Sequence, residues 1–112
     1  MSDQALSGIL VLDLSENISG PYCTKLLADY GAEVIKIERP GGGDISRSIG
    51  PFPHDEPHQE RSGLFLFLNT NKKGITLDLE RGAHIFKRLV KEADVVVENF
   101  APGAMSDIGL GY

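Results

Sequence analysis

Residues 9–38 constrain the fold most strongly, because they have the pattern of a strand, a helix and a second strand. The apolar run Ile9–Leu14, which Asp13 and Ser15 close, is typical of a strand that is buried on both faces. A Gly-Pro pair at 20–21 then opens a predicted helix, since proline loses no hydrogen bond in a first helical turn. The second run, Val34–Glu38, completes the unit. Two such strands are expected to be parallel, with a right-handed crossover.

Inside this predicted helix, apolar residues recur at spacings of one, three and four, which predicts one apolar face packed on the sheet. That face consists of Tyr22, Cys23, Leu26, Leu27 and Tyr30. The pattern would bury the thiol of Cys23, and a buried, unreactive thiol is the ordinary expectation for such a cysteine.

The rest of the chain continues the alternation of strands and helices. Strands are predicted over 75–79 and 94–98, and helices over 81–92 and 102–108. Residues 64–68 are apolar but too few to classify. Residues 39–63 contain three consecutive glycines and four prolines, and a loop of this length in a compact domain is usually functional or mobile. We therefore predict an α/β fold of Rossmann-like type, with a mainly parallel sheet flanked by helices.

Composition limits the class of protein. The 112 residues suffice for one modest domain, and 41% hydrophobic and 24% charged residues are ordinary for a globular protein. No apolar run reaches the roughly 18 residues of a membrane span, and residues 1–4 lack the basic start of a signal peptide. Cys23 is the single cysteine, so no internal disulfide can form. These features favour a cytoplasmic location, and the net charge of −5 argues against a nucleic-acid partner.

Two familiar kinds of site are not supported. A dinucleotide site needs glycines in the turn after the first strand, but that turn contains Glu16, which would repel a pyrophosphate. His54 and His58 have the spacing of a zinc-binding pair, but prolines surround them and no further ligand completes the set, so no metal site is predicted.

Polar residues at strand ends are the candidate binding groups. Arg39 directly follows the second strand and is either a solvated arginine or a clamp on a phosphate or an adenine. Lys72 and Lys73 are either surface lysines or cations for phosphate. Asn99 could cap the next helix, and Phe100 could be a core aromatic.

Seven segments together resemble the N-terminal part of the class III CoA-transferase family, which includes formyl-CoA transferase, carnitine CoA-transferase and α-methylacyl-CoA racemase. They are residues 11–15, 20–21, 27–38, 43–44, 71–73, 77–79 and 94–103. The resemblance extends from about Leu6 to Tyr112. It implies that residues 1–112 are an incomplete N-terminal segment of a larger CoA-binding domain.

The resemblance also implies roles for single residues. Arg39 matches the basic residue that meets the nucleotide end of CoA. Asn71, Lys72 and Lys73 match a motif that lies close to bound CoA, and Asn99 and Phe100 match a corner that lines the CoA channel. These six residues are the predicted CoA-binding set, and no tightly bound cofactor is implied.

The chain departs from the family pattern at two positions and lacks its nucleophile. Ile18 stands where some transferases carry a glutamine, and Asp107 stands where several members have a basic residue that can help to hold phosphate. An acid at 107 would weaken anion binding. The family's catalytic aspartate, which forms a mixed anhydride with the acyl group, lies beyond Tyr112, so no catalytic residue is assigned.

The resemblance therefore implies the CoA-binding portion of an enzyme that moves CoA between an acyl-CoA and a small carboxylic acid. Two alternatives stay open: a racemase-type enzyme that transfers protons, and a non-catalytic CoA-binding fragment. The isolated chain is expected to be inactive. It is also expected to form a homodimer or to associate with the missing C-terminal part.

Overall fold

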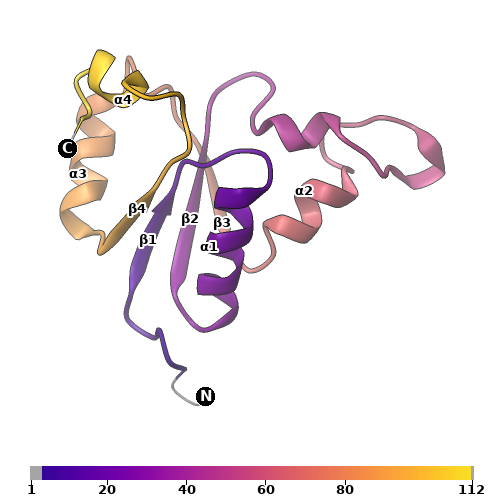
Figure 1. Ribbon diagram of the computed structural model, residues 1–112, viewed down its shortest axis with the longest axis horizontal. Helices are drawn as coiled ribbons and strands as arrows, with labels where there is room; N and C mark the ends of the chain where they lie inside the picture. The colour runs from indigo at the N-terminus through magenta and orange to yellow at the C-terminus, as the bar shows by residue number, and fades with distance from the viewer. Residues whose placement is uncertain (1–3, 112) are drawn as a thin grey trace.

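Four parallel strands form the central sheet of the computed structural model, which describes residues 4–111 (Figure 1). The strands are β1 (Leu10–Asp13), β2 (Glu33–Glu38), β3 (Lys73–Thr76) and β4 (Val95–Val97). Their order across the sheet is β3-β2-β1-β4, and each neighbouring pair is parallel. The predicted α/β fold with a mainly parallel sheet is confirmed.

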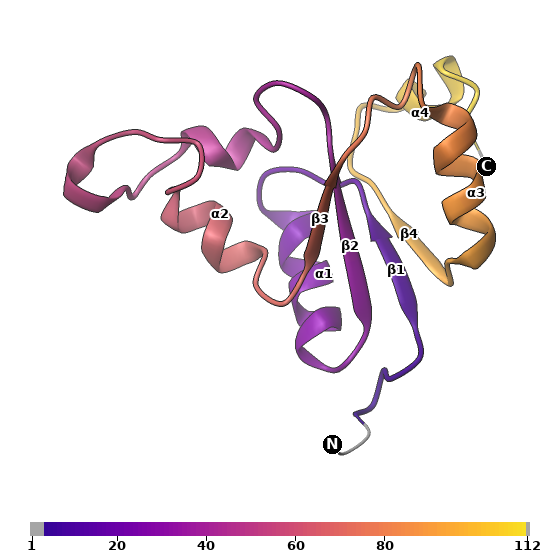
Figure 2. The same ribbon diagram turned by 180° about the vertical axis from the view of Figure 1, so that it is seen from behind.

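Helices cover both faces of this sheet (Figures 1 and 2). The helices are α1 (Ser19–Asp29), α2 (Gly63–Leu68), α3 (Ala83–Glu92) and α4 (Ala104–Asp107), and two short 3₁₀ turns are η1 (Ile45–Ser48) and η2 (Pro53–Asp55). Helix α1 packs on one face, with α2 beside it, whereas α3 packs on the other. The unclassified apolar segment at 64–68 is thus helical, because Ser62 caps it by accepting a hydrogen bond from the Phe65 amide at 3.2 Å.

Each face of the sheet has its own apolar cluster, since successive side chains of a strand point to opposite faces. On the α1 face, Val11 and Val34 pack against Ala28 and Ala32. On the α3 face, the cluster consists of Leu12, Leu14, Ile37 and Phe86. The α1 cluster is confined to the amino half of the sheet, because the next inward residues of β1 and β2 are Asp13 and Lys36.

The predicted inner face of α1 is largely wrong: of its five residues, Leu27 packs against the α1-face cluster and the other four are exposed. Pro21, Thr24 and Ala28 are the buried residues of this helix, whereas Tyr22 and Tyr30 are 47% and 61% exposed. Cys23 is also exposed, which corrects the expectation of a buried thiol. The sheet beneath α1 accounts for this, because the buried Asp13 carboxylate accepts a hydrogen bond from the Thr24 hydroxyl at 2.6 Å. A small polar residue therefore faces the sheet, and Tyr22, Leu26 and Tyr30 are exposed.

Strand β3 begins two residues earlier than predicted and ends at Thr76. Lys73 to Thr76 pair with Ile35 to Glu38, and one further hydrogen bond joins the Leu77 amide to the Glu38 carbonyl at 2.9 Å. Beyond that point β2 has ended, so the apolar alternation at 77–79 has no strand to pair with. Leu77 and Leu79 instead pack against the α3-face cluster.

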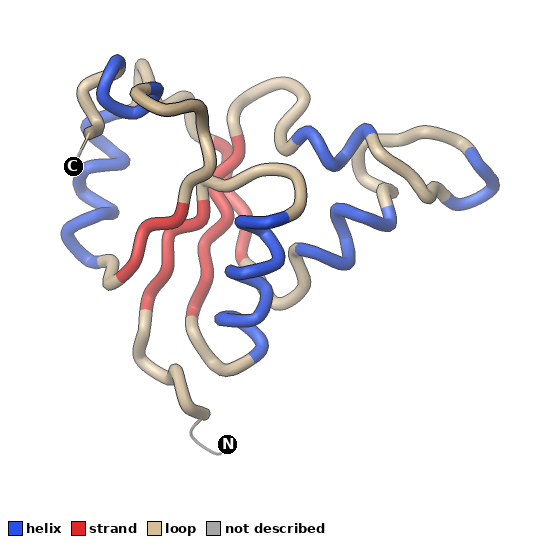
Figure 3. Tube along the Cα trace, viewed as in Figure 1, coloured by secondary structure: helices blue, strands red, loops and turns tan. Residues whose placement is uncertain are grey.

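The segment between β2 and α2 projects away from the sheet as a long excursion with two 3₁₀ turns (Figure 3). Arg47 anchors it. Its guanidinium donates two hydrogen bonds to the Glu38 carboxylate at 2.7 Å and lies 3.7 Å from the centre of the Phe65 ring. Stacking and a bidentate ion pair together fix a guanidinium strongly.

Candidate functional site

The candidate site lies at the carboxyl edge of the sheet, between β1 and β4. The chain leaves β1 toward α1 on one face, and it leaves β4 toward α4, which packs with the α3-face cluster on the other. Ligands of open α/β sheets bind at such a switch point, where the connections from two neighbouring strands run to opposite faces of the sheet. Three of the predicted residues, Arg39, Asn99 and Phe100, are at this edge.

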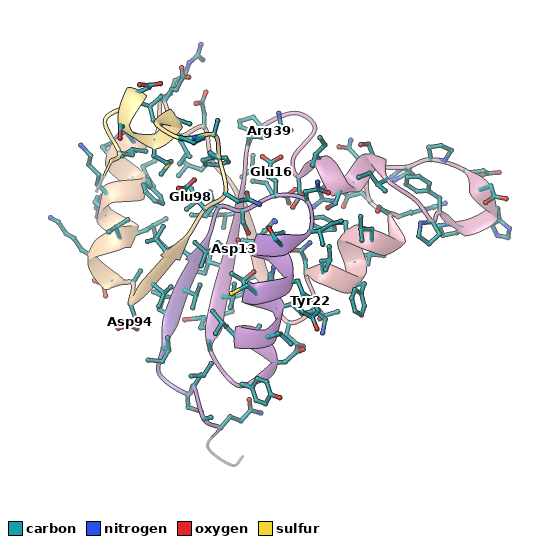
Figure 4. All side chains as sticks on the ribbon, viewed as in Figure 1. Asp13, Glu16, Tyr22, Arg39, Asp94 and Glu98 are labelled. Carbon is teal, nitrogen blue, oxygen red and sulfur yellow. The ribbon has the colours of Figure 1, made fainter. Side chains whose placement is uncertain are left out.

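Arg39 is held by Glu16, the third residue after β1 (Figure 4). The Arg39 Nε atom lies 3.1 Å from Oε2 of Glu16, and Arg39 Nε also donates to the Gly43 carbonyl at 3.1 Å. The arginine side chain is still 60% exposed. A guanidinium that is oriented but accessible can bond to a phosphate or stack on a planar base.

Asn99 binds the backbone of the same residue. Its Oδ1 accepts from the Glu16 amide at 2.9 Å, and its Nδ2 donates to the Glu16 carbonyl at 2.8 Å. Glu16 thus joins the two predicted binding residues, Arg39 through its carboxylate and Asn99 through its backbone. This residue is absent from the predicted binding set.

Phe100 is half-buried and lines a hollow of about 200 Å³ beside Arg39. Leu14, Ile37 and Leu77 contribute apolar walls, and the rim is acidic: Glu16, Asp78 and Glu80. A second, larger hollow of about 410 Å³ lies against the 39–63 excursion and is lined by Arg39, Arg47, Phe52 and His58 among others. Arg39 therefore borders both hollows.

Lys72 does not join this group, contrary to the prediction that residues 71–73 fold back to it. Its side chain is 1% exposed and its ammonium lies beneath α1. It donates to Asp13 Oδ2 at 2.8 Å, to Asn69 Oδ1 at 2.7 Å and to the Pro21 carbonyl at 3.1 Å. All three of its protons have partners inside the fold.

Asn71 and Lys73 lie at the opposite, amino edge of the sheet. The Asn71 amide donates to Asp29, the last residue of α1, at 2.9 Å. The Lys73 ammonium pairs with Glu33, the first residue of β2, at 2.5 Å. The direction of β3 requires this, because a segment that enters a parallel strand must lie at its amino end. The predicted cluster of six is thus divided into three separate places.

A second buried ion pair lies beside Lys72. The Lys36 ammonium contacts Asp44 Oδ2 at 2.5 Å and the Ser15 carbonyl at 2.7 Å, and both side chains are at most 3% exposed. Each buried side-chain nitrogen and oxygen among residues 4–111 has a hydrogen-bond partner. We call the set Asp13, Lys36, Asp44 and Lys72 the buried charge network.

The network shifts the pKa values of its members. Burial by itself would raise the pKa of Asp13, but the charges of Lys72 and Lys36 and two hydrogen bonds hold it below its ordinary value. The pKa of Asp44 is also lowered: burial opposes this, and hydrogen bonds from Lys36, Asn17 and Ser46 outweigh it. Burial lowers the pKa of Lys72. The balanced charges mean that the network offers no free cation to a ligand.

Neither a metal-binding cluster nor a membrane-spanning helix occurs in the part of the chain that the structure describes. No group of three or more His, Cys, Asp or Glu side chains within residues 4–111 is arranged to hold a metal ion. The helices of this same range are too short or too polar to cross a membrane.

Comparison with known families decides where this chain is placed. The family model described as CoA-transferase family III matches residues 6–112. The chain belongs to CoA-transferase family III. Its resemblance to that family, inferred above from seven short segments, is thus confirmed over nearly the whole length.

Relatives in this family agree with the assignment. The chain is 47% identical to succinyl-CoA:glutarate CoA-transferase of Mus musculus over 99% of its length, which is 25% of that protein. It is 47% identical to succinyl-CoA:mesaconate CoA-transferase of Haloarcula hispanica and to formyl-CoA:oxalate CoA-transferase of Afipia carboxidovorans, covering 28% and 25% of those proteins. The chain therefore spans about a quarter of these CoA-transferases.

Solved structures show the same fold. A CAIB/BAIF family protein from Brucella suis superposes with a TM-score of 0.85 at 38% identity, over 99% of this chain and 30% of that one. The protein Rv3272 from Mycobacterium tuberculosis superposes with a TM-score of 0.83 at 40% identity, over 97% of this chain and 29% of its own. The family III chain described here is therefore a partial domain.

Proposed function

We propose that this family III chain is the CoA-binding portion of an acyl-CoA:carboxylate CoA-transferase. The observation that supports it best is that Glu16, in the loop after β1, contacts both Arg39 and Asn99 beside an apolar hollow that Phe100 lines. An accessible guanidinium next to an apolar wall suits the nucleotide end of CoA, because that end has phosphate groups as well as a flat base. The three CoA-transferases named above favour a transferase over a racemase.

The covalent step belongs in this proposal to an aspartate outside the chain. That residue would attack the acyl-CoA carbonyl and form a mixed anhydride while CoA leaves as the thiolate. The thiolate would then attack the aspartyl carbonyl, which gives an aspartyl-CoA thioester and releases the donor acid. The acceptor carboxylate would attack this thioester and form a second anhydride with renewed loss of the thiolate, and attack of the thiolate on the acceptor carbonyl would give the new acyl-CoA and free the aspartate. Asp13 and Asp44 are unsuited to this role. Each is at most 1% exposed and is neutralised by a lysine.

The experiment is titration calorimetry of the chain with CoA and with 3′-dephospho-CoA. The variant Arg39→Ala removes one charge-assisted contact at an exposed site, and it is expected to weaken CoA binding about tenfold. Arg88→Ala is the matched control, because Arg88 is an exposed arginine on α3, away from the site. Equal affinity of the Arg39→Ala variant and the parent for both ligands would show that the binding site lies elsewhere.

The proposal includes association with a second copy or with the complementary C-terminal part of a full-length enzyme. Strand β4 is an edge strand, and Val95 and Val96 are 39% and 41% exposed. The outward side of α1 adds Tyr22 and Tyr30. Exposed strand edges and apolar residues of this kind favour association. Sedimentation velocity is expected to show species larger than a monomer at micromolar concentration, and a compact monomer throughout that range would contradict this part.

A further inference from the structure

Side chains from three other segments bind the loop between β1 and α1, residues 14–18. Lys36 in β2 donates to the Ser15 carbonyl at 2.7 Å. Asp44, after β2, accepts from the Asn17 amide at 3.0 Å, and Asn17 has the left-handed φ of +73°. Asparagine adopts that conformation more readily than other non-glycine residues, so the sequence suits the bend that these hydrogen bonds fix. The loop is therefore fixed from outside.

Asn99 is the third residue that binds the loop, and it binds the backbone of Glu16. Its carboxamide binds both the amide and the carbonyl of Glu16, although 83 residues separate them. Gly20 keeps this loop close to α1, because an added Cβ there would collide with the Ser15 side chain. The backbone of Glu16 is thus clamped on both sides of its Cα.

The Glu16 carboxylate in turn orients the guanidinium of Arg39. Its Oε2 is 3.1 Å from Arg39 Nε, and its Oε1 is 3.3 Å from Arg39 Nη2 and from the Ile45 amide. The contacts with Glu16 and with the Gly43 carbonyl all involve Nε and Nη2, so they fix one edge of the guanidinium. The remaining Nη1 side is the part of the guanidinium that can meet a ligand.

We propose that Asn99 is a positioning residue that orients Arg39 through Glu16, rather than a direct ligand of CoA. This rests on the proposed function, in which Arg39 binds CoA. An asparagine carboxamide has two N–H donors and two acceptor lone pairs. Asn99 uses one donor and one lone pair to bind the Glu16 backbone, even without a ligand. Asn99 then affects CoA affinity only as far as Arg39 does.

The hydrogen bonds from Asn99 to Glu16, and their effect on Arg39, are tested without ligand by NMR of the 12.1 kDa chain. Asn99→Ala is expected to speed exchange of the Glu16 amide proton and of the Arg39 Nε proton. Asn99→Asp keeps the acceptor and loses the donor, so it is expected to retain protection of the Glu16 amide. Asp94→Ala is the matched control, since Asp94 holds the other end of β1 by accepting from the Leu10 amide at 2.9 Å. Its effect is expected to stay at the Leu10 amide. Unchanged exchange of both Glu16 and Arg39 protons in Asn99→Ala would overturn the proposal.

The functional part is tested by a double-mutant cycle in CoA titrations. Asn99→Ala is expected to weaken CoA binding about threefold to tenfold in the parent and to have no further effect in the Arg39→Ala background. Additive effects would overturn the proposal, because they would make Asn99 an independent ligand; an unchanged affinity in Asn99→Ala would overturn it too. If Arg39→Ala itself binds CoA like the parent, the proposed CoA site fails, while the exchange measurements still decide whether Asn99 orients Arg39.

Discussion

Replacing Lys72 with methionine is expected to destabilise the fold strongly at neutral pH. The change removes the three hydrogen bonds that the ammonium makes to Asp13, Asn69 and the Pro21 carbonyl. Methionine fills a similar volume, so the loss is chiefly electrostatic. The Asp13 carboxylate, which is completely buried, would keep its charge and lose its nearest cation.

The magnitude follows from that burial. Removing one partner of a buried ion pair costs about 3–5 kcal/mol, because an uncompensated charge stays in the interior. Lys36 lowers the pKa of Asp13 as well, so some compensation persists and the lower end of the range is expected. Since domains are stable by about 5–15 kcal/mol, this loss is a large fraction of the total free energy of unfolding.

The assay is urea unfolding followed by far-ultraviolet circular dichroism, with Lys73→Met as the control. Lys73 is the adjacent residue, but its side chain is 73% exposed and its pair with Glu33 is a surface pair, so its replacement should cost less than about 1 kcal/mol. The double variant Lys72→Met/Asp13→Leu should recover much of the loss, because it removes both charges. If Lys72→Met and Lys73→Met unfold at the same urea concentration, Lys72 is not buried as described and could bind phosphate after all.

Three further results are expected. The pKa values of Asp13, Asp44 and Glu38 are lowered in the folded state, so the unfolded chain takes up protons first as the pH falls. The free energy of unfolding should therefore be retained above about pH 5 and decline below about pH 4. A free energy of unfolding that stays constant in urea titrations between about pH 6 and 3 would contradict this. Arg47→Met should accelerate limited proteolysis within the 39–63 excursion, since it removes the pair with Glu38 and the stack on Phe65, whereas equal digestion rates would show that the anchor is unimportant. The purified chain should exchange no CoA between two acids above a protein-free control, because the proposed nucleophile lies outside it; a time-dependent exchange would refute that placement.

The parallel sheet and its carboxyl edge could be predicted from the sequence, because apolar runs that end in polar residues at turns are typical of buried parallel strands. Arg39 and Asn99 each come soon after a strand, so the position of both at one edge follows from the topology. The position of Asn71 and Lys73 also follows from strand direction, since both enter β3. The family resemblance at 71–73 predicts that these residues lie near CoA, but it does not predict the edge of the sheet at which each side chain lies.

The interior of the α1 face is harder to predict. Lys36 stands between two isoleucines and Asp13 between two leucines, and these are local signals of buried charge in the strands. Its partner Asp44 and the neighbouring pair of Asp13 with Lys72 come from separate segments, up to 59 residues apart. Periodicity shows which side chains share a face but not which charges meet there. For the same reason hydrophobicity alone predicts the wrong inner face for α1, where Thr24 faces the sheet.

The alternation of Asp13 with Leu12 and Leu14 has a consequence for how the strands align during folding. A slip of β1 by one residue would exchange its two faces and drive the Asp13 carboxylate among the aliphatic and aromatic side chains around Phe86. The same slip would leave the ammonium groups of Lys36 and Lys72 facing leucines. We expect misaligned sheets to be rejected by charge as well as by shape, so that the charge in β1 and its partner at the entry to β3 are better tolerated when they are replaced together than when either is replaced alone.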